Sequence, residues 1–178
     1  TAGGTTASPS SGAVHADKLF GIHLNLLAVP RDPKLITDPT PDERRYLGEL
    51  ETWIKEETGY QWIQGTRPQT LAAALNDSPA GLAAWIVEKF RSWSDVDGNV
   101  EKHFTKDDLL TNITLYWVTQ TATSSARIYY ENQRAKPAQG RVQVPTACAA
   151  VPQAISIPPR RWVEAQYNLS RWTEMPRG

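Results

Sequence analysis

Cysteine and histidine, the side chains that most often serve as nucleophile, base or soft metal ligand, are few and widely spaced along this chain. Its single cysteine is Cys148, and its three histidines are His15, His23 and His103. No two histidines are three or four residues apart, the spacing that brings two imidazoles onto one metal ion. We therefore predict no metal site and no bound cofactor. His23 lies inside an apolar segment, and we expect it to be a hydrogen-bonded core histidine.

Other chemical signals are incomplete. Cys148 follows a predicted strand, where catalytic groups can lie in α/β sheets, but the alanines beside it supply neither a base nor a charge that stabilises a thiolate. No Gly-x-Ser-x-Gly elbow is present. Residues 95–99 resemble the start of a calcium loop, yet its sixth and twelfth positions hold Val100 and Lys106 in place of glycine and glutamate. We interpret that segment as a solvated turn.

Composition excludes several function classes. Lysine and arginine together number 19, as do aspartate and glutamate, so the formal net charge is zero and no nucleic-acid partner is expected. A single cysteine excludes an intramolecular disulfide and favours a reducing compartment, so we predict a cytoplasmic protein. No run approaches the ~18 apolar residues of a membrane span, and no signal-peptide pattern is visible. We therefore expect a soluble chain without a membrane span.

The elements that must position any site are helices in the middle of the chain and strands around them. Four or five consecutive helices are predicted between residues 41 and 132, the first of them ending near residues 58–59. Seven tryptophans and six tyrosines can supply their core or a pocket. The helix start signals are N-caps, first-turn prolines and a capping box, at residues 40–41, 66–68, 78–79 and 105–108.

Strand signals flank this helical region. Residues 18–24 have the aliphatic density of a short buried strand, and residues 141–144 alternate between a glycine and a proline, as a strand does. A short helix that Pro158-Pro159 can start, running through residues 162–167, and a last strand over residues 169–174 complete the pattern. The order predicts an α/β sheet interrupted by an all-helical insertion.

Several segments form a specific combination that extends from about residue 15 to the end of the chain. In this order they resemble the epoxide hydrolases of the microsomal type, a branch of the α/β-hydrolase fold. The segments are Gly-Ile-His-Leu-Asn at 21–25, Gly-Tyr-Gln-Trp-Ile-Gln-Gly-Thr-Arg-Pro at 59–68, 75–90, 109–112 through 115–117 to Tyr-Tyr-Glu-Asn at 129–132, 144–146, 158–162 and 171–178.

The resemblance implies a partial α/β-hydrolase fold with a helical lid between sheet strands, and a detoxifying hydrolase function. The expected parts are a flexible segment at 1–13, a core strand and connection at 14–40, the lid at 41–132, and later core strands with a helix at 133–178. In such enzymes a carboxylate opens a hydrophobic epoxide to a covalent ester, and a histidine-activated water hydrolyses this ester to a vicinal diol.

The resemblance also assigns residue roles. In the family, two lid tyrosines donate hydrogen bonds to the epoxide oxygen, and these correspond to Tyr60 and Tyr129 in this sequence. The alternative is that both are ordinary core tyrosines. Trp62 and Trp117 are candidates for lining an apolar substrate pocket, with core packing as the equal alternative.

Other parts of the family pattern are missing from the sequence. The nucleophile belongs to a Gly-Gly-Asp-Trp-Gly elbow, but Gly3-Gly4 is followed here by Thr5-Thr6; the position of the triad acid holds Ala154, and the histidine would follow Gly178. We therefore expect this chain to be inactive alone. It is then a lid-containing portion of an epoxide hydrolase, a non-catalytic binding module for small apolar ligands, or a fragment that needs a complementary segment or a second copy to cover its open edges.

Overall fold

The computed structural model describes residues 15–27, 29, 37–135, 140–152 and 157–177. The chain divides into two compact units. The sheet unit comprises residues 1–57 and 136–178, and the helical unit comprises residues 58–135. The predicted flexible segment at 1–13 and the position of Ala154 lie outside the described residues.

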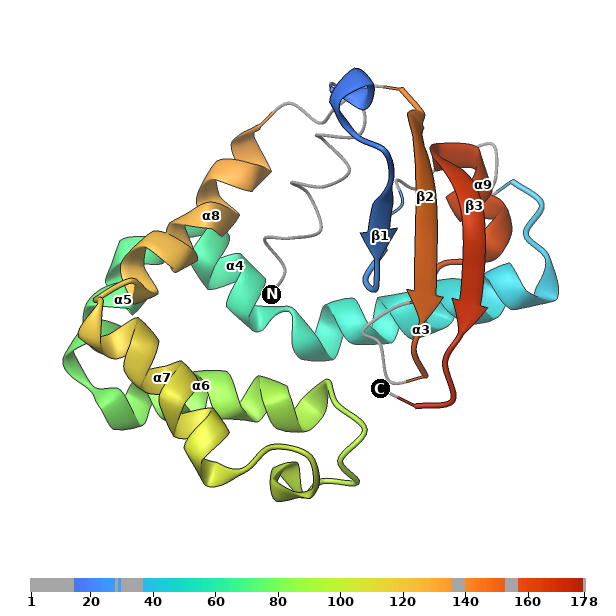
Figure 1. The fold of residues 1–178 in the computed structure, drawn as a ribbon. Helices are drawn as coiled ribbons and strands as arrows, with labels where there is room; N and C mark the ends of the chain where they lie inside the picture. Colours follow the sequence, from blue (N-terminus) through green and yellow to red (C-terminus); the bar gives the residue numbers. More distant parts are fainter. Residues whose placement is uncertain (1–14, 28, 30–36, 136–139, 153–156, 178) are drawn as a thin grey trace. The chain divides into compact units, whose positions relative to one another are not determined.

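The sheet unit contains a three-stranded parallel sheet in the order β1 (Ile22–Leu24), β2 (Val142–Ala150) and β3 (Tyr167–Glu174) (Figure 1). Parallel neighbours need a crossover connection. The helical unit lies in the connection from β1 to β2, and α9 (Arg160–Gln166) lies in the connection from β2 to β3. The predicted order of strand, helical insertion, strand, helix and strand is confirmed.

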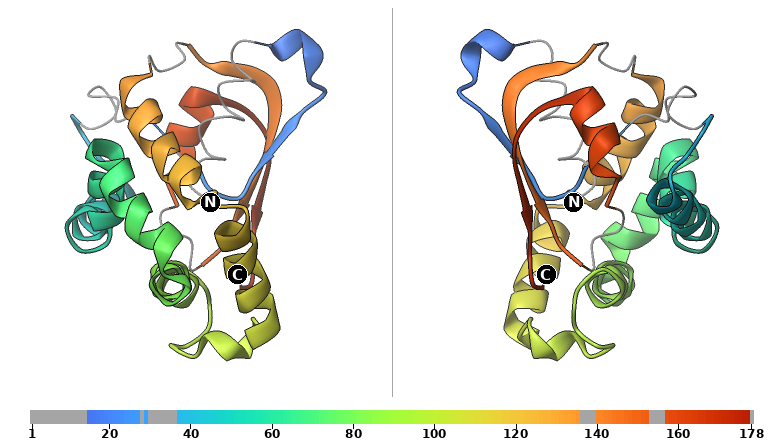
Figure 2. Two further views of the ribbon diagram at one scale, coloured as in Figure 1. Left: turned by 90° about the vertical axis from the view of Figure 1, so that its left-hand side faces the viewer. Right: turned by 90° about the vertical axis from the view of Figure 1, so that its right-hand side faces the viewer.

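The core of the sheet unit lies between the sheet and α9, which covers one face of the strands (Figure 2). Side chains alternate along β2, because successive residues of a strand point to opposite faces. Val142, Val144 and Cys148 are buried with Val163 of α9. Thr146 and Ala150, which fall on the same alternation, are also buried, whereas the side chains at 143, 145, 147 and 149 are exposed or half-buried.

Helix α3 (Pro41–Glu57) begins at the predicted Thr40–Pro41 signal. Thr40 N donates to Glu43 Oε2 (2.8 Å) and Glu43 N donates to Thr40 Oγ1 (3.3 Å), so the two residues form a capping box. The Glu43 carboxylate is 1% exposed and accepts hydrogen bonds from Trp162 Nε1 (2.6 Å) and Arg161 Nη2 (3.1 Å). This cluster fastens α3 to α9.

The helical unit contains five α-helices in its described residues. They are α4 (Gly59–Thr66), α5 (Pro68–Asp77), α6 (Pro79–Ser92), α7 (Lys106–Val118) and α8 (Ala122–Arg134). The N-caps predicted at Ser78 and Thr105 are confirmed: Ser78 Oγ accepts from Gly81 N, and Thr105 and Asp108 form a capping box. A core of Leu75, Leu82, Ile113 and Ala122 joins α5, α6, α7 and α8. Short 3₁₀ turns occur at Ala16–Lys18 and Val100–Lys102.

Several sequence predictions are corrected. Helix α3 ends at Glu57, close to the predicted end, but Gly59 begins a further helix, α4, that was not predicted. Residues 41–134 therefore hold six described α-helices instead of four or five. The first strand is shorter than residues 18–24, and His23 within it is exposed, not a core residue, because its side chain points away from the face that buries Leu24. Strand β2 continues to Ala150, so Cys148 lies inside the strand and not after it.

Candidate functional site

Tyr60 and Tyr129 lie on facing helices of the helical unit. Their ring centroids are 5.7 Å apart and the ring planes meet at 85°, an edge-to-face arrangement favoured between aromatic rings. Tyr60 is in the first turn of α4, and Tyr129 is in the second half of α8. The structure therefore brings together the two residues that the resemblance singles out, across 69 positions of sequence.

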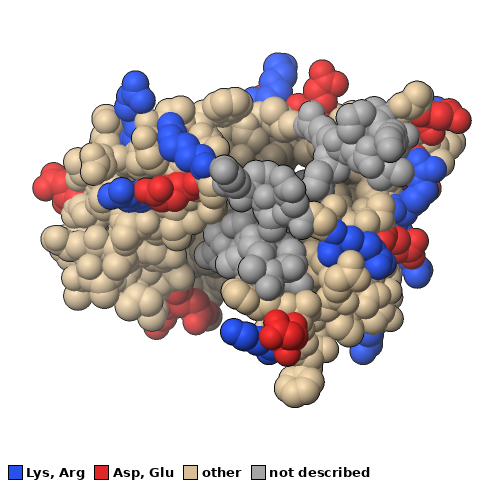
Figure 3. All heavy atoms as spheres, turned by 90° about the horizontal axis from the view of Figure 1, so that it is seen from above, with Lys and Arg blue, Asp and Glu red and all other residues tan. Residues whose placement is uncertain are grey.

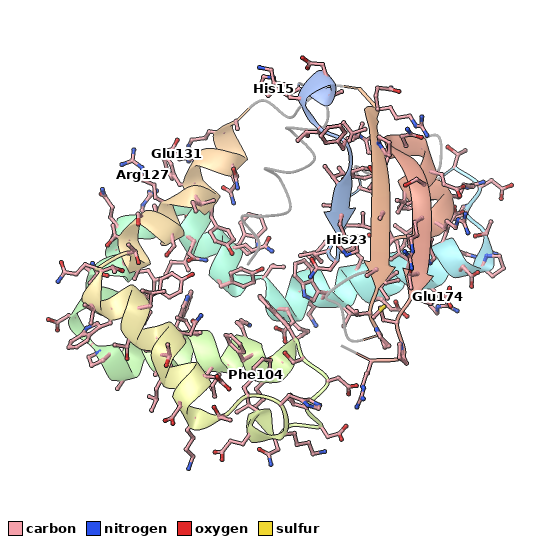
Figure 4. All side chains as sticks on the ribbon, viewed as in Figure 1. His15, His23, Phe104, Arg127, Glu131 and Glu174 are labelled. Atoms are coloured by element: carbon pink, nitrogen blue, oxygen red, sulfur yellow. The ribbon has the colours of Figure 1, made fainter. Side chains whose placement is uncertain are left out.

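Each tyrosine belongs to the inward stripe of its helix. Residues three and four apart share a helix face, and on α8 the buried Ala122 and Ala126 share a face with the half-buried Tyr129. Arg127 and Glu131 lie side by side on another face of α8 (Figure 4), where Arg127 Nε and Glu131 Oε1 are 2.9 Å apart and both side chains are more than half exposed. Tyr129, two residues from each, is thereby directed to α4 and away from this exposed ion pair.

Close packing of α4 against α8 fixes the distance between the tyrosines. A Cβ built on Gly65 would lie 2.0 Å from Nε2 of Gln133, so the glycine leaves room for this side chain of α8. Arg134 Nη1 also donates to the Gly65 carbonyl oxygen (3.1 Å). Gly65 thus contributes contacts between the two helices that carry the tyrosine pair.

Two glutamines of α4 hold the tyrosine hydroxyls. Gln61 Nε2 donates to the Tyr60 hydroxyl over 2.8 Å, and the Gln64 side chain forms a hydrogen bond with the Tyr129 hydroxyl. Gln64 is 7% exposed. Sequence reasoning missed both glutamines. The signal was present in their positions one and four residues after Tyr60, but that spacing has meaning only once residues 59–66 are known to be helical.

The Tyr129 phenol is held in its protonated form. Burial raises the pKa of Tyr129 to about 12, with further increases from the nearby Tyr60 and Tyr116 and an opposing decrease from the Gln64 hydrogen bond. Burial raises a phenol pKa because it disfavours the charged phenolate. Tyr129 therefore carries a proton throughout the neutral range and is available as a hydrogen-bond donor.

An aromatic and cationic cluster surrounds Tyr60. Its ring centroid is 5.3 Å from that of Trp93, and Lys89 Nζ lies 5.5 Å from the Tyr60 centroid and 5.1 Å from the Trp93 centroid. Lys89 Nζ also pairs with Glu88 Oε2 at 2.8 Å. Cation–π attraction and ring packing from the C-terminal end of α6 thus hold the Tyr60 ring in place.

The two candidate tryptophans occupy different surroundings. Trp62 is 64% exposed on α4 and donates from Nε1 to Thr58 Oγ1 (3.2 Å). Because it is two residues from Tyr60, it points to a different face of the helix. Trp117 is 39% exposed on α7, and its Nε1 donates to the carbonyl oxygen of Asn76 (3.0 Å). Their role in lining a substrate pocket stays a prediction.

The remaining candidates show no arrangement for catalysis. Cys148 is 2% exposed, and burial raises the pKa of its thiol, which opposes formation of a nucleophilic thiolate. His15, His23 and His103 are exposed, and Figure 4 shows the first two in separate places on the sheet unit. Among the described residues, no group of three histidine, cysteine or acidic side chains could hold a metal ion.

The surface of the described chain carries other features. A hollow of about 290 Å³ in the helical unit is lined by residues 66–70, Arg127 and Tyr130, and not by Tyr60 or Tyr129. Acidic and basic side chains are interspersed on the face seen in Figure 3, in keeping with their equal numbers. None of the described helices combines the length and the apolar character needed to cross a bilayer.

Comparison with known sequences identifies relatives of one kind. No family model matches the chain. The chain is 43% identical over 161 residues to a putative epoxide hydrolase of Stigmatella aurantiaca, covering 90% of this chain and 37% of that protein. It is also 43% identical over 137 residues to epoxide hydrolase 1 of Oryctolagus cuniculus, covering 70% of this chain and 30% of that protein. The chain thus spans about a third of the length of these relatives.

Solved structures agree. The juvenile hormone epoxide hydrolase of the silkworm Bombyx mori matches with a TM-score of 0.83 and 27% identity, over 98% of this chain and 47% of that one. The Aspergillus niger epoxide hydrolase matches with a TM-score of 0.77 and 25% identity, over 96% of this chain and 43% of that one. These neighbours confirm the predicted partial α/β-hydrolase fold with a helical insertion.

Proposed function

Because the chain belongs to the epoxide hydrolases of the α/β-hydrolase fold, we propose that its helical unit binds a hydrophobic epoxide through the hydroxyl groups of Tyr60 and Tyr129. The observation that carries this proposal is the pair itself. Two phenols from different helices lie with ring centroids 5.7 Å apart. The Tyr60 oxygen accepts a hydrogen bond from Gln61, and Tyr129 is hydrogen-bonded to Gln64.

The chemistry of epoxide opening requires such donors. When a nucleophile attacks a ring carbon, the carbon–oxygen bond breaks and the oxygen develops the charge of an alkoxide, which is a poor leaving group unless donors meet that charge. A phenol is protonated at neutral pH and can donate. The raised pKa of Tyr129, about 12, keeps its proton in place before the bond breaks.

The complete reaction gives a vicinal diol in the family that the chain resembles, through a carboxylate nucleophile and a histidine-activated water. Within the 178 residues, threonines follow Gly3-Gly4 and alanine occupies position 154, where the family pattern has the nucleophile and the acid. Removing a nucleophile or its base abolishes most catalysis. The 178-residue polypeptide taken alone is therefore proposed to bind an epoxide without turning it over, and its single cysteine favours a cytoplasmic location.

The test combines binding with product analysis. Purified 178-residue chain is dialysed to equilibrium against styrene oxide, and both free epoxide and phenylethanediol are measured by chromatography. We expect binding without diol, and about tenfold weaker binding for Tyr60→Phe or Tyr129→Phe, the effect of one hydrogen bond. Tyr130→Phe is the matched control, because it removes a hydroxyl from the neighbouring residue of α8, whose ring packs under Arg134.

Either half of the proposal can fail separately. Diol formation that Tyr60→Phe abolishes would show that this polypeptide is a catalyst by itself. Equal binding by the wild type and both tyrosine variants would remove the tyrosine pair from the site. Intact mass spectrometry of the natural protein gives an independent check on the fragment hypothesis, since a component much heavier than 19.8 kDa would show that additional chain exists.

A further inference from the structure

The C-terminal ends of α4 and α8 are joined by a single guanidinium. Arg134, the last residue of α8, donates from Nη1 to the carbonyl oxygen of Gly65 over 3.1 Å and to that of Tyr130 over 3.0 Å. Gly65 lies in the last turn of α4, and Tyr130 lies about one turn before Arg134 in α8 itself. One nitrogen therefore bonds to carbonyl groups of both helices.

The last turn of α4 gains a donor and a charge from this contact. The last four carbonyl groups of a helix have no partner within that helix, and a positive charge is favourable at this end. Helix α4 has no basic residue in its own last turn and is 8 residues long, a length at which an isolated helix is marginal in water. Arg134 supplies from α8 what the last turn of α4 lacks.

The Tyr130 ring orients the guanidinium. Arg134 Cζ lies 3.4 Å from the centroid of the Tyr130 ring, so the cation stacks on the ring face. A planar guanidinium can stack on a ring and donate several hydrogen bonds at the same time, whereas a lysine ammonium has no plane that stacks. The contact therefore depends on the shape of arginine as well as on its charge.

The guanidinium contact and the tyrosine pair lie at matching positions along the two helices. Tyr60 and Gly65 are five positions apart on α4, as are Tyr129 and Arg134 on α8. At a rise of 1.5 Å per residue, the two contacts are about 7.5 Å apart along the helices. A single contact allows two helices to pivot, whereas two separated contacts fix the angle and the register between them.

We propose that Arg134 is a positioning residue for the tyrosine pair: by joining the C-terminal ends of α4 and α8, it fixes the spacing at which the Tyr60 ring meets the Tyr129 ring. The spacing itself is a property of the folded chain. Its consequence for ligands rests on the proposed function, because a site made of both phenols loses affinity when their spacing changes.

Nuclear Overhauser effects between the ring protons of Tyr60 and Tyr129 measure this spacing directly, in the 178-residue chain with labelled tyrosines. Arg134→Met removes the guanidinium, and Arg134→Lys keeps the charge without the planar group. We expect the ring-to-ring signal to be lost in Arg134→Met and weakened in Arg134→Lys. Arg127→Met is the matched control and should leave the signal unchanged, because Arg127 pairs with Glu131 on another face of α8.

Ligand binding gives the second measurement. Equilibrium dialysis compares the wild type and Arg134→Met with styrene oxide and with phenylcyclopropane, which replaces the epoxide oxygen with a methylene group. We expect Arg134→Met to bind styrene oxide about fivefold more weakly and phenylcyclopropane unchanged. In a Tyr129→Phe background, Arg134→Met should cause a smaller additional loss of styrene oxide affinity, since one of the hydroxyls that it positions is already absent.

The outcomes separate this inference from the proposed function. If Arg134→Met keeps the ring-to-ring signal, the inference is overturned. If the signal is lost but the wild type binds both probes equally, or binds neither, the positioning role of Arg134 is supported and the proposed function fails. If the wild type prefers styrene oxide and Arg134→Met keeps its full affinity, only the inference is overturned.

A general role in stability is tested on the same variants. Far-UV circular dichroism measures the helix content of Arg134→Met, Arg134→Lys and the Arg127→Met control, and we expect all three to match the wild type. Unfolding of both Arg134 variants, or an equal loss of affinity for the two probes, would assign Arg134 to the stability of the whole helical unit and would overturn the inference.

Discussion

The sheet unit and the helical unit each hold a polar cluster between two helices, around Glu43 in the first and around Tyr60 and Tyr129 in the second. The two clusters use hydrogen bonds in different ways. In the sheet unit, the Glu43 carboxylate only accepts, and Arg161 and Trp162 donate to it. In the helical unit, the Tyr60 hydroxyl accepts from the Gln61 amide, Tyr129 is hydrogen-bonded to Gln64, and a phenol can donate as well as accept. The first arrangement joins two helices through a charge, whereas the second consists of the neutral groups to which the proposed function assigns ligand binding.

The two clusters also differ in the protonation state that burial selects. Burial by itself would raise the pKa of Glu43, but hydrogen bonds from the Thr40 backbone, Trp162 and the Thr40 side chain, with the charge of Arg161, hold this pKa below its usual value. For Tyr129 the effect of burial prevails and the pKa rises to about 12. The sheet unit has therefore fixed a charge, and the helical unit has fixed a neutral donor.

The largest expected effect is on stability, from Glu43→Ala. This change removes the capping box of α3 and leaves the Trp162 indole N–H buried without its acceptor, so we expect a loss of about 3 kcal/mol in unfolding free energy. Urea unfolding followed by tryptophan fluorescence measures it. Glu49→Ala is the control on the same helix, because Glu49 is exposed and its pair with Arg45 is 3.8 Å long; its loss should stay below about 0.5 kcal/mol.

The same variant sharpens the comparison at acid pH. Because the folded pKa of Glu43 is depressed, its contribution to stability is present above the unfolded pKa of about 4.3 and is lost as the pH falls through the folded pKa. Glu43→Ala should therefore flatten the acid limb of the unfolding free energy. An acid limb that is as steep in Glu43→Ala as in the wild type would show that the Glu43 cluster is not the charge that stabilises the sheet unit.

The alkaline limb should report the helical unit. The folded pKa of Tyr129 is about 12, above the unfolded value of about 10, so its contribution is complete below pH ~10 and is lost as the pH rises to about 12. The loss amounts to about 2 kcal/mol at one pKa unit per 1.36 kcal/mol, reduced for partial exposure. Urea unfolding between pH 9 and pH 12 should show a shallower decline in Tyr129→Phe, with Tyr130→Phe as the control.

The next smaller effect is on ligand binding. Here the helical-unit variant is expected to lose more than the sheet-unit variant. Tyr129→Phe should weaken styrene oxide binding about tenfold, equivalent to ~1.4 kcal/mol, while it changes the unfolding free energy at neutral pH by under about 0.5 kcal/mol. Glu43→Ala should lower the unfolding free energy and leave styrene oxide affinity unchanged for as long as the chain stays folded. Equilibrium dialysis and urea unfolding on the same preparations make this comparison, and a Tyr129→Phe variant that loses stability but not affinity would contradict it.

How much the sequence could reveal depends on whether a signal is local. The starts of α3, α6 and α7 were predicted because the N-cap residues Thr40, Ser78 and Thr105 bond within one turn of themselves. Helix α4 was missed because Gly59 is typical of a helix end, and this short helix is stabilised by its contact with α8. A partner that lies dozens of residues away leaves no mark on local spacing.

Strand and site predictions follow the same rule. The predicted strand at 141–144 was ended at Pro145, but the structure accommodates this proline at an irregularity in the pairing with β3, where proline is tolerated. Tyr60 and Tyr129 were found through the family resemblance alone. Their glutamine partners depend on the packing of α4 on α8, so no reading of residues 59–66 by themselves could have identified them.

The smallest expected effect concerns the ring cluster beside Tyr60. Lys89 lies over the rings of both Tyr60 and Trp93, so Lys89→Met should lower the unfolding free energy by about 0.5–1 kcal/mol, the value of a partly exposed cation–π contact. Urea unfolding measures it, with Lys106→Met as the control at a 75% exposed lysine of α7. If Lys89→Met lowers styrene oxide affinity without changing stability, the cation acts on the Tyr60 hydroxyl and not on the packing of its ring, and the proposed binding site extends from α4 to α6.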